Sequence, residues 1–169
     1  MPSAVKPMAC VLVVDDEERV RVSITAVLRR AGHHVTTAED GDDALGKFYP
    51  GHFDLVITDI VMPRREGIET LRTLRKLEPG IRIIAMSESG GDHGFYLKAA
   101  AALGADATLG KPFTATDLRL IVGEALALPR SDMAALWYRY MPDWVSPISE
   151  PDARSDRHRT PQDLHSRNS

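Results

Sequence analysis

The chain contains a single cysteine, Cys10, among its 169 residues. This excludes an internal disulfide and a zinc site built from several cysteines. No apolar run approaches the roughly 18 residues that a membrane-spanning helix needs. The first residues also lack the apolar stretch of a secretory signal. These absences predict a cytosolic protein that has no membrane partner.

An excess of positive charge is also missing. Lysine and arginine number 21 against 24 aspartate and glutamate residues, which gives a formal net charge of -3. Proteins that bind nucleic acid normally carry a basic patch that neutralises phosphates, so we expect no nucleic-acid partner. Hydrophobic residues make up 43% of the chain and charged residues 27%. This composition is typical of a folded globular domain.

What the sequence does contain is a series of short apolar runs, each followed by a helical pattern. The runs expected to form strands are residues 10–14, 34–38, 54–58, 81–86 and 107–110, and the expected helices are 18–31, 40–49, 66–77, 95–103 and 115–127. Such alternation is typical of parallel β/α units. We therefore predict an α/β fold of the (βα)5 type, a doubly wound, five-stranded parallel sheet.

Polar side chains follow four of these runs at the points where the strands are expected to end. They are Asp15, Asp16, Asp59, Ser87 and Lys111. Ligands of open parallel sheets bind outside the carboxyl ends of the strands, so these side chains are expected to share one edge. Carboxylates suit Mg²⁺, an ammonium suits a phosphate oxygen, and an aspartate can act as a nucleophile. The pattern predicts a site for a divalent cation and a phosphoryl group.

Four motifs, taken in this order, resemble the receiver domain of two-component response regulators over residues 8–128. They are Val-Asp-Asp-Glu at 14–17, Thr-Asp-Ile-Val-Met-Pro at 58–63 with Gly67, Ser87 after a strand, and Lys111-Pro112-Phe113. Each motif alone is weak, but each follows its own strand and the combination is specific. The fold that the resemblance implies is the flavodoxin-like receiver fold.

The resemblance also implies roles for the residues at the phosphoryl group. Asp59 would be the phosphoacceptor, while Lys111 and Ser87 would hold the phosphoryl oxygens. The Lys111–Pro112 peptide bond would be cis, which in receivers turns the lysine into the site. The chain would not be an enzyme, since it would catalyse only its own phosphoryl uptake and loss.

Mg²⁺ is the cofactor that the resemblance implies. Its ligands would be the carboxylates of Asp16 and Asp59 and the carbonyl of Val61, with Asp15 acting mainly through water. Three carboxylates gathered without a cation repel one another, and a bound metal ion removes that cost. The resemblance and the chemistry of the side chains therefore agree on the cation.

The sequence departs from the family pattern at several positions, two of which lie near the lysine and hydroxyl positions of that pattern. Many receivers carry tyrosine or phenylalanine three residues before the lysine, where this chain has Thr108. A small residue usually follows the hydroxyl residue, where this chain has Glu88. That carboxylate is expected either to slow phosphorylation by repulsion or to point to solvent. Both departures leave the phosphoryl chemistry intact and the output mechanism open.

The last 41 residues differ in composition from the rest. They contain five of the eleven prolines, both tryptophans and no glycine. We predict a short non-globular C-terminal extension over residues 129–169, partly helical near 132–141 and largely disordered after 149. Its aromatic segment, Leu136 to Val145, is expected to dock on the receiver domain or on a partner.

The leading hypothesis is a stand-alone receiver of a two-component phosphorelay. It would accept a phosphoryl group from a histidine kinase or a histidine phosphotransfer protein. Phosphorylation would then switch the binding of an output protein by the receiver or by its C-terminal segment. One alternative is a phosphotransfer intermediate or phosphate sink without an output partner, and another is an adaptor that works without phosphorylation. Weak homodimerisation is left open.

Overall fold

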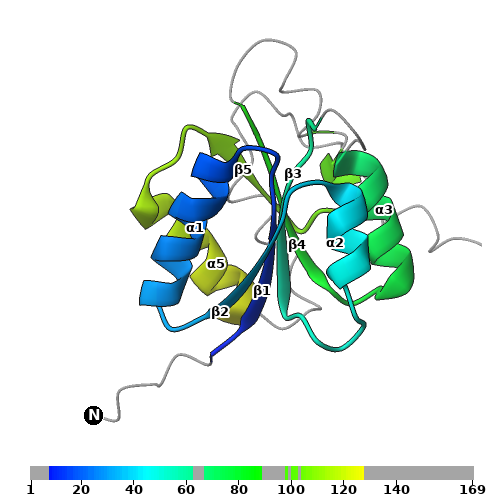
Figure 1. The fold of residues 1–169 in the computed structure, drawn as a ribbon, viewed down its shortest axis with the longest axis horizontal. Helices are drawn as coiled ribbons and strands as arrows, with labels where there is room; N and C mark the ends of the chain where they lie inside the picture. Colours follow the sequence, from blue (N-terminus) through cyan, green and yellow to red (C-terminus); the bar gives the residue numbers. More distant parts are fainter. Residues whose placement is uncertain (1–7, 63–66, 89–97, 99, 103, 128–169) are drawn as a thin grey trace, which may run out of the picture.

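The chain forms a five-stranded parallel sheet covered by helices on both faces, in a computed structural model that describes residues 8–62, 67–88, 98, 100–102 and 104–127 (Figure 1). The strands are β1 (Cys10–Val14), β2 (His34–Ala38), β3 (Leu55–Asp59), β4 (Arg82–Glu88) and β5 (Ala107–Lys111). Their order in the sheet is β2-β1-β3-β4-β5, and every neighbouring pair is parallel. The predicted doubly wound α/β fold is confirmed.

Four helices flank this sheet in the described part of the chain. They are α1 (Glu18–Arg30), α2 (Gly41–Lys47), α3 (Gly67–Leu77) and α5 (Ala115–Ala127). Figure 1 shows α1 and α5 on one face and α2 and α3 on the other. The predicted helix at 95–103 is described only at residues 98 and 100–102, which are helical.

The three central strands β1, β3 and β4 contribute side chains alternately to two hydrophobic cores. In β1, Val11 and Val13 belong to the core under α1 and α5, while Leu12 and Val14 belong to the core under α2 and α3. All four side chains are fully buried. A parallel sheet covered on both faces needs apolar residues on both sides, which explains the continuous apolar runs in the sequence.

The ends of the helices follow signals in the sequence. The backbone of Gly32 has φ +90°, which ends α1 in a conformation that glycine adopts readily. The hydroxyl of Thr114 accepts a hydrogen bond from the Asp117 N–H at 3.1 Å, and the Asp117 carboxylate accepts one from the Thr114 N–H at 2.8 Å. This reciprocal cap starts α5 where the sequence predicts it. The helix then buries the four residues expected to face inward, which are Leu118, Ile121, Val122 and Ala125.

Three strand ends differ from the prediction in a way that bears on the site. β3 extends to Asp59, β4 runs to Glu88 instead of ending at residue 86, and β5 runs to Lys111 instead of ending at residue 110. β4 is longer because Ser87 and Glu88 pair with Gly110 and Lys111 of β5. The polar residues therefore form the last rungs of the sheet, where their backbones are held by the ladder.

The predicted extension over residues 129–169, including its aromatic segment, lies outside the described residues. The longest helices that the structure describes, α1 and α5, have 13 residues each. None of the helices in this part of the chain has the length and apolar character that crossing a bilayer requires.

Candidate functional site

Three aspartates meet at the carboxyl edge of the sheet. Asp15 and Asp16 follow β1, and Asp59 ends the neighbouring strand β3. Carboxylate oxygens from all three lie within 4.8 Å of one another. Asp15 and Asp59 are buried, whereas Asp16 is exposed. The strand ends therefore assemble the acidic cluster that the sequence predicts.

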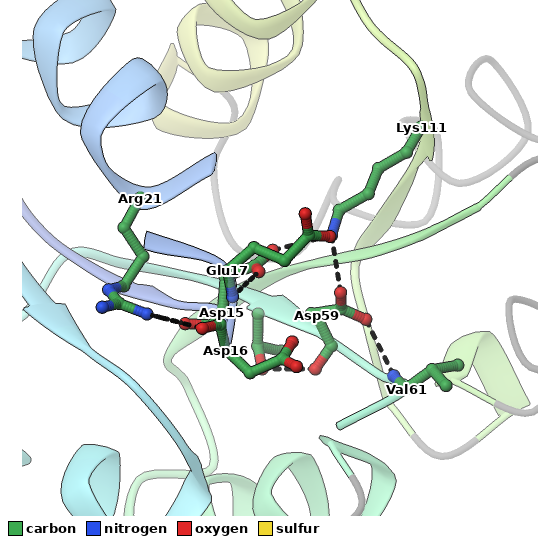
Figure 2. A network of polar contacts seen from close by, with 8 residues as sticks. Asp15, Asp16, Glu17, Arg21, Asp59, Val61 and Lys111 are labelled. Atoms are coloured by element: carbon green, nitrogen blue, oxygen red, sulfur yellow. Dashed lines mark hydrogen bonds and ion pairs between the residues drawn. The ribbon is translucent and has the colours of Figure 1, made fainter. Parts of the chain in front are cut away.

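Lys111 binds two of these aspartates from the end of β5, which β4 separates from β3 in the sheet. Its Nζ donates hydrogen bonds to Asp15 Oδ2 at 2.7 Å and to Asp59 Oδ2 at 2.6 Å (Figure 2). The lysine side chain is only 12% exposed. The Lys111–Pro112 peptide bond is cis, as predicted. Residues separated by 96 and 52 positions in the sequence are thus held in one charged network.

Burial and charge act against each other on the ionisable groups of this network. Burial raises the pKa of the Asp15 carboxyl above its ordinary value and outweighs the hydrogen bonds that lower it. Burial opposes the charge of Lys111, but its hydrogen bonds and charge interactions with Asp15 and Asp59 prevail and raise its pKa. The lysine is therefore firmly protonated. One ammonium cannot balance three carboxylates, so the cluster favours a further cation.

The loop between β1 and α1 is fixed by its own hydrogen bonds. Asp15 Oδ1 accepts the Glu17 N–H at 2.9 Å, so both oxygens of this carboxylate are engaged. Arg21 Nη1 donates to the carbonyl oxygens of Asp15 at 2.6 Å and of Asp16 at 3.1 Å (Figure 2). No hydrogen bond within the described part of the chain engages the Asp16 carboxylate. The loop thus presents Asp16 to an external ligand.

Sequence reasoning missed the role of Arg21 in this loop. The residue lies in α1, where an arginine is ordinarily interpreted as a solvated surface residue. Its position five residues after Asp16 and six after Asp15 is the only signal in the sequence. That spacing places it on the second turn of the helix, within reach of the preceding loop.

The loop after β3 holds the other side of Asp59. The Val61 N–H donates to Asp59 Oδ1 at 2.8 Å, and Val61 itself is 41% exposed. The Gly67 N–H at the start of α3 donates to the Ile60 carbonyl at 3.2 Å. A Cβ on Gly67 would lie 2.9 Å from the Asp59 carbonyl carbon and 2.5 Å from Ile60 Cα. Only glycine therefore allows α3 to begin so close to Asp59.

Ser87 and Glu88 complete this edge of the sheet from β4. Ser87 is 1% exposed, and its hydroxyl has no hydrogen-bond partner among the described residues. A buried hydroxyl without a partner is costly, so a ligand that accepts its hydrogen bond would be stabilising. Glu88 is exposed and contributes, with Lys111, to the lining of a cleft of about 490 Å³ between α1 and the loop after β5.

Known proteins with similar sequences share this region of the chain. Residues 11–123 match the family model of the response regulator receiver domain. The DNA-binding transcriptional regulator NtrC of Azospirillum brasilense is 36% identical over 118 residues, which are 70% of this chain and 24% of that protein. The alkaline phosphatase synthesis transcriptional regulatory protein PhoP of Bacillus subtilis is 34% identical over 125 residues, which are 74% of this chain and 50% of that protein. The chain thus spans about a quarter of the length of the first relative and half of the second.

Solved structures show the same fold. The chemotaxis response regulator CheY4 of Vibrio cholerae superposes with a TM-score of 0.65 at 31% identity, covering 71% of this chain and all of that one. A CheY-like receiver domain protein of Methanospirillum hungatei gives a TM-score of 0.66 at 27% identity, covering 76% of this chain and 98% of the other.

Proposed function

Because this chain belongs to the family of response regulator receiver domains of two-component systems, we propose that Asp59 accepts a phosphoryl group from a phosphorylated histidine of a kinase or phosphotransfer protein. One observation carries the proposal. The two oxygens of the Asp59 carboxylate are held separately, Oδ1 by the Val61 N–H at 2.8 Å and Oδ2 by Lys111 at 2.6 Å. A nucleophile fixed in this way has little orientational freedom to lose on reaction.

The chemistry of the transfer follows from these contacts. An oxygen of the Asp59 carboxylate attacks phosphorus, and the new O–P bond forms as the N–P bond of the phosphohistidine breaks. The imidazole ring, protonated on its second nitrogen, leaves as neutral imidazole with the bonding electron pair. Lys111 then moves its hydrogen bond from Asp59 to a phosphoryl oxygen, and the unpartnered hydroxyl of Ser87 donates to another.

The acidic cluster fits a Mg²⁺ ion by the chemistry of its donors, which are all oxygens. We assign the carboxylates of Asp16 and Asp59 and the carbonyl of Val61 as direct ligands. We assign Asp15 a role mainly through water, because its side chain is fully buried. When bound, the ion supplies positive charge that offsets the repulsion of the carboxylates and polarises the phosphoryl group.

Phosphorylation adds roughly -1.5 to -2 charges at this edge of the sheet, enough to change which partner binds there. A switch of partner binding is therefore the output we propose. A second function, that of a phosphotransfer intermediate or phosphate sink, is favoured by one residue. Thr108 is 5% exposed in β5 and stands where many receivers carry an aromatic residue. Its small side chain cannot relay the change through aromatic packing.

Phosphoryl uptake from acetyl phosphate in the presence of Mg²⁺ tests the shared part of both functions. Intact-protein mass spectrometry should show one added phosphoryl group per chain, which is absent when EDTA is added before the donor and absent in Asp59→Asn. Asp54→Asn, the same change at the opposite edge of the sheet, should retain uptake. Undiminished uptake in Asp59→Asn would contradict the assignment. Rapid return of the phosphoryl group to a histidine phosphotransfer protein would favour the sink over the switch.

A further inference from the structure

Glu88 lies on the same face of the sheet as the proposed phosphoacceptor. Met86, two residues earlier in β4, pairs with Asp59 of β3 and belongs to the core under α1 and α5. Side chains two residues apart on a strand point to the same face. Glu88 itself pairs with Lys111, whose ammonium binds Asp59. The alternation therefore directs the Glu88 carboxylate toward the α1 and α5 side, above the charged network.

The separation of Glu88 from Asp59 follows from the geometry of the sheet. Glu88 stands two residues further along the strand direction, about 6.6 Å, and one strand to the side, about 4.8 Å, so that the two Cα atoms are about 8 Å apart. Glu88 is exposed and lines the cleft of about 490 Å³ with Lys111, Glu17 and Arg19. A carboxylate thus lines the cleft that contains Lys111.

We propose that Glu88 is a specificity-determining residue of this site, which disfavours dianionic acyl phosphates relative to N-phosphoryl donors. An N-phosphoryl donor that is protonated on nitrogen has a net charge less negative by one; the proton lies on the leaving nitrogen in phosphoramidate and on the second ring nitrogen in phosphohistidine. The proposal rests on Asp59 being the phosphoacceptor. It predicts that this receiver takes its phosphoryl group from phosphohistidine in preference to small acyl phosphates in the surrounding solution.

Coulomb's law gives the size of the effect. If the Cα separation of about 8 Å is taken as the separation of the charges, one carboxylate in water disfavours a dianion about fourfold at an ionic strength of about 0.01 M, and a monoanion about twofold. The ratio of the two rates should therefore change about twofold when the charge of Glu88 is removed. At about 1 M salt the Debye length falls to about 3 Å, and the difference should vanish.

Acetyl phosphate and phosphoramidate are suitable probes because they deliver the same group to the same nucleophile. With acetyl phosphate, the Asp59 O–P bond forms as the bond between phosphorus and the acetyl oxygen breaks, and acetate leaves with the electron pair. With phosphoramidate, the P–N bond breaks and ammonia leaves, its nitrogen already protonated. A change in the reactivity of Asp59 would alter both rates equally and leave their ratio unchanged. The ratio therefore reports only the effect of the charge of the donor.

The experiment measures phosphorylation rates with both donors and Mg²⁺ at about 0.01 M and about 1 M ionic strength. Glu88→Gln should raise the acetyl phosphate rate about fourfold and the phosphoramidate rate about twofold at low salt only. Glu88→Asp retains the charge and should retain the wild-type ratio. Glu78→Gln is the matched control. It also removes one negative charge, but Glu78 follows α3 at the opposite edge of the sheet, and the glutamine can still accept the hydrogen bond from the Gly51 N–H.

The outcomes separate this inference from the proposed function. Labelling of Asp59 with an unchanged donor ratio in Glu88→Gln would overturn the role of Glu88 and leave the phosphoacceptor intact. An equal change of ratio in Glu78→Gln would also overturn it, since the effect would then reflect net charge alone. Failure of both donors to label Asp59 would overturn the proposed function, and this inference with it.

Discussion

Gly67→Ala should destabilise the protein because the new methyl group meets backbone on the far side of the loop. The Cβ would lie 2.5 Å from Ile60 Cα and 2.9 Å from the Asp59 carbonyl carbon. Both distances are below 3.0 Å, a separation under which Cβ contacts are essentially never observed. Overpacking typically costs about 1–3 kcal/mol. We expect the upper end, about 3 kcal/mol, because the obstacle is main chain and the Gly67 N–H to Ile60 hydrogen bond must shift with it.

Urea unfolding measures this change directly. The free energy of unfolding falls by about 1–3 kcal/mol for each molar increase in urea. A loss of about 3 kcal/mol of this free energy therefore lowers the urea concentration at the unfolding midpoint by about 1 M or more. Gly46→Ala is a matched control in α2, since a Cβ added there would meet no atom within 4 Å apart from the adjacent residues and backbone of its own helix. Alanine is favoured over glycine inside a helix by about 0.5–1 kcal/mol, so this variant should be stabilised.

The two substitutions are chemically identical and are expected to shift the midpoint in opposite directions. Gly67→Ala should also slow phosphoryl uptake, because relief of the contact moves the backbone of Asp59 itself. A Gly67→Ala protein as stable as the wild type would refute the reasoning. A shift of the same sign and size in both variants would do so as well, since it would reflect helix propensity and not the close approach.

Three further predictions concern single side chains. Asp16→Ala should weaken Mg²⁺ binding, measured by calorimetry, more than Asp15→Ala does, and equal losses would contradict the assignment of ligands. Arg75→Ala should cost about 2–3 kcal/mol of unfolding free energy, because its guanidinium binds three carbonyl oxygens and the Asp106 carboxylate; the exposed Arg72→Ala should stay within about 0.5 kcal/mol. Burial raises the pKa of Asp15 in the folded, metal-free protein above the ordinary value of 3.8. The protonated Asp15 therefore stabilises the fold fully at a pH below 3.8, and this stabilisation is lost as the pH rises through the pKa of the folded state. Asp15→Asn should therefore gain stability relative to the wild type over that interval in EDTA, and a parallel pH dependence of both proteins would contradict this.

The fold was predictable because its signals are local. Buried parallel strands are recognisable in the sequence as apolar runs. Glycine, proline and threonine mark the ends of the helices, as at Gly32 and Thr114. The exact strand ends were less predictable, since the extension of β4 to Glu88 depends on pairing with β5. Periodicity along one segment carries no information about the length of its neighbour.

The acidic cluster and Lys111 were predictable for a related reason, because strand ends in a parallel sheet share one edge. The contacts of long side chains were not. Arg21 binds carbonyl oxygens of the preceding loop, and Arg75 joins α3 to the segments before β4 and β5. Both are arginines on amphipathic helices, where the sequence pattern indicates only an exposed face. Their partners become evident only once the loops are placed in space.

The most direct test of the central claim is to locate the phosphoryl group in the sequence. The protein is treated with a phosphodonor and Mg²⁺, and the acyl phosphate is then reduced with borohydride, which converts a phosphorylated aspartate to homoserine. Peptide mass spectrometry should find homoserine at position 59, and Lys111→Ala should reduce its yield. Homoserine at Asp15 or Asp16 with Asp59 unmodified would contradict the account.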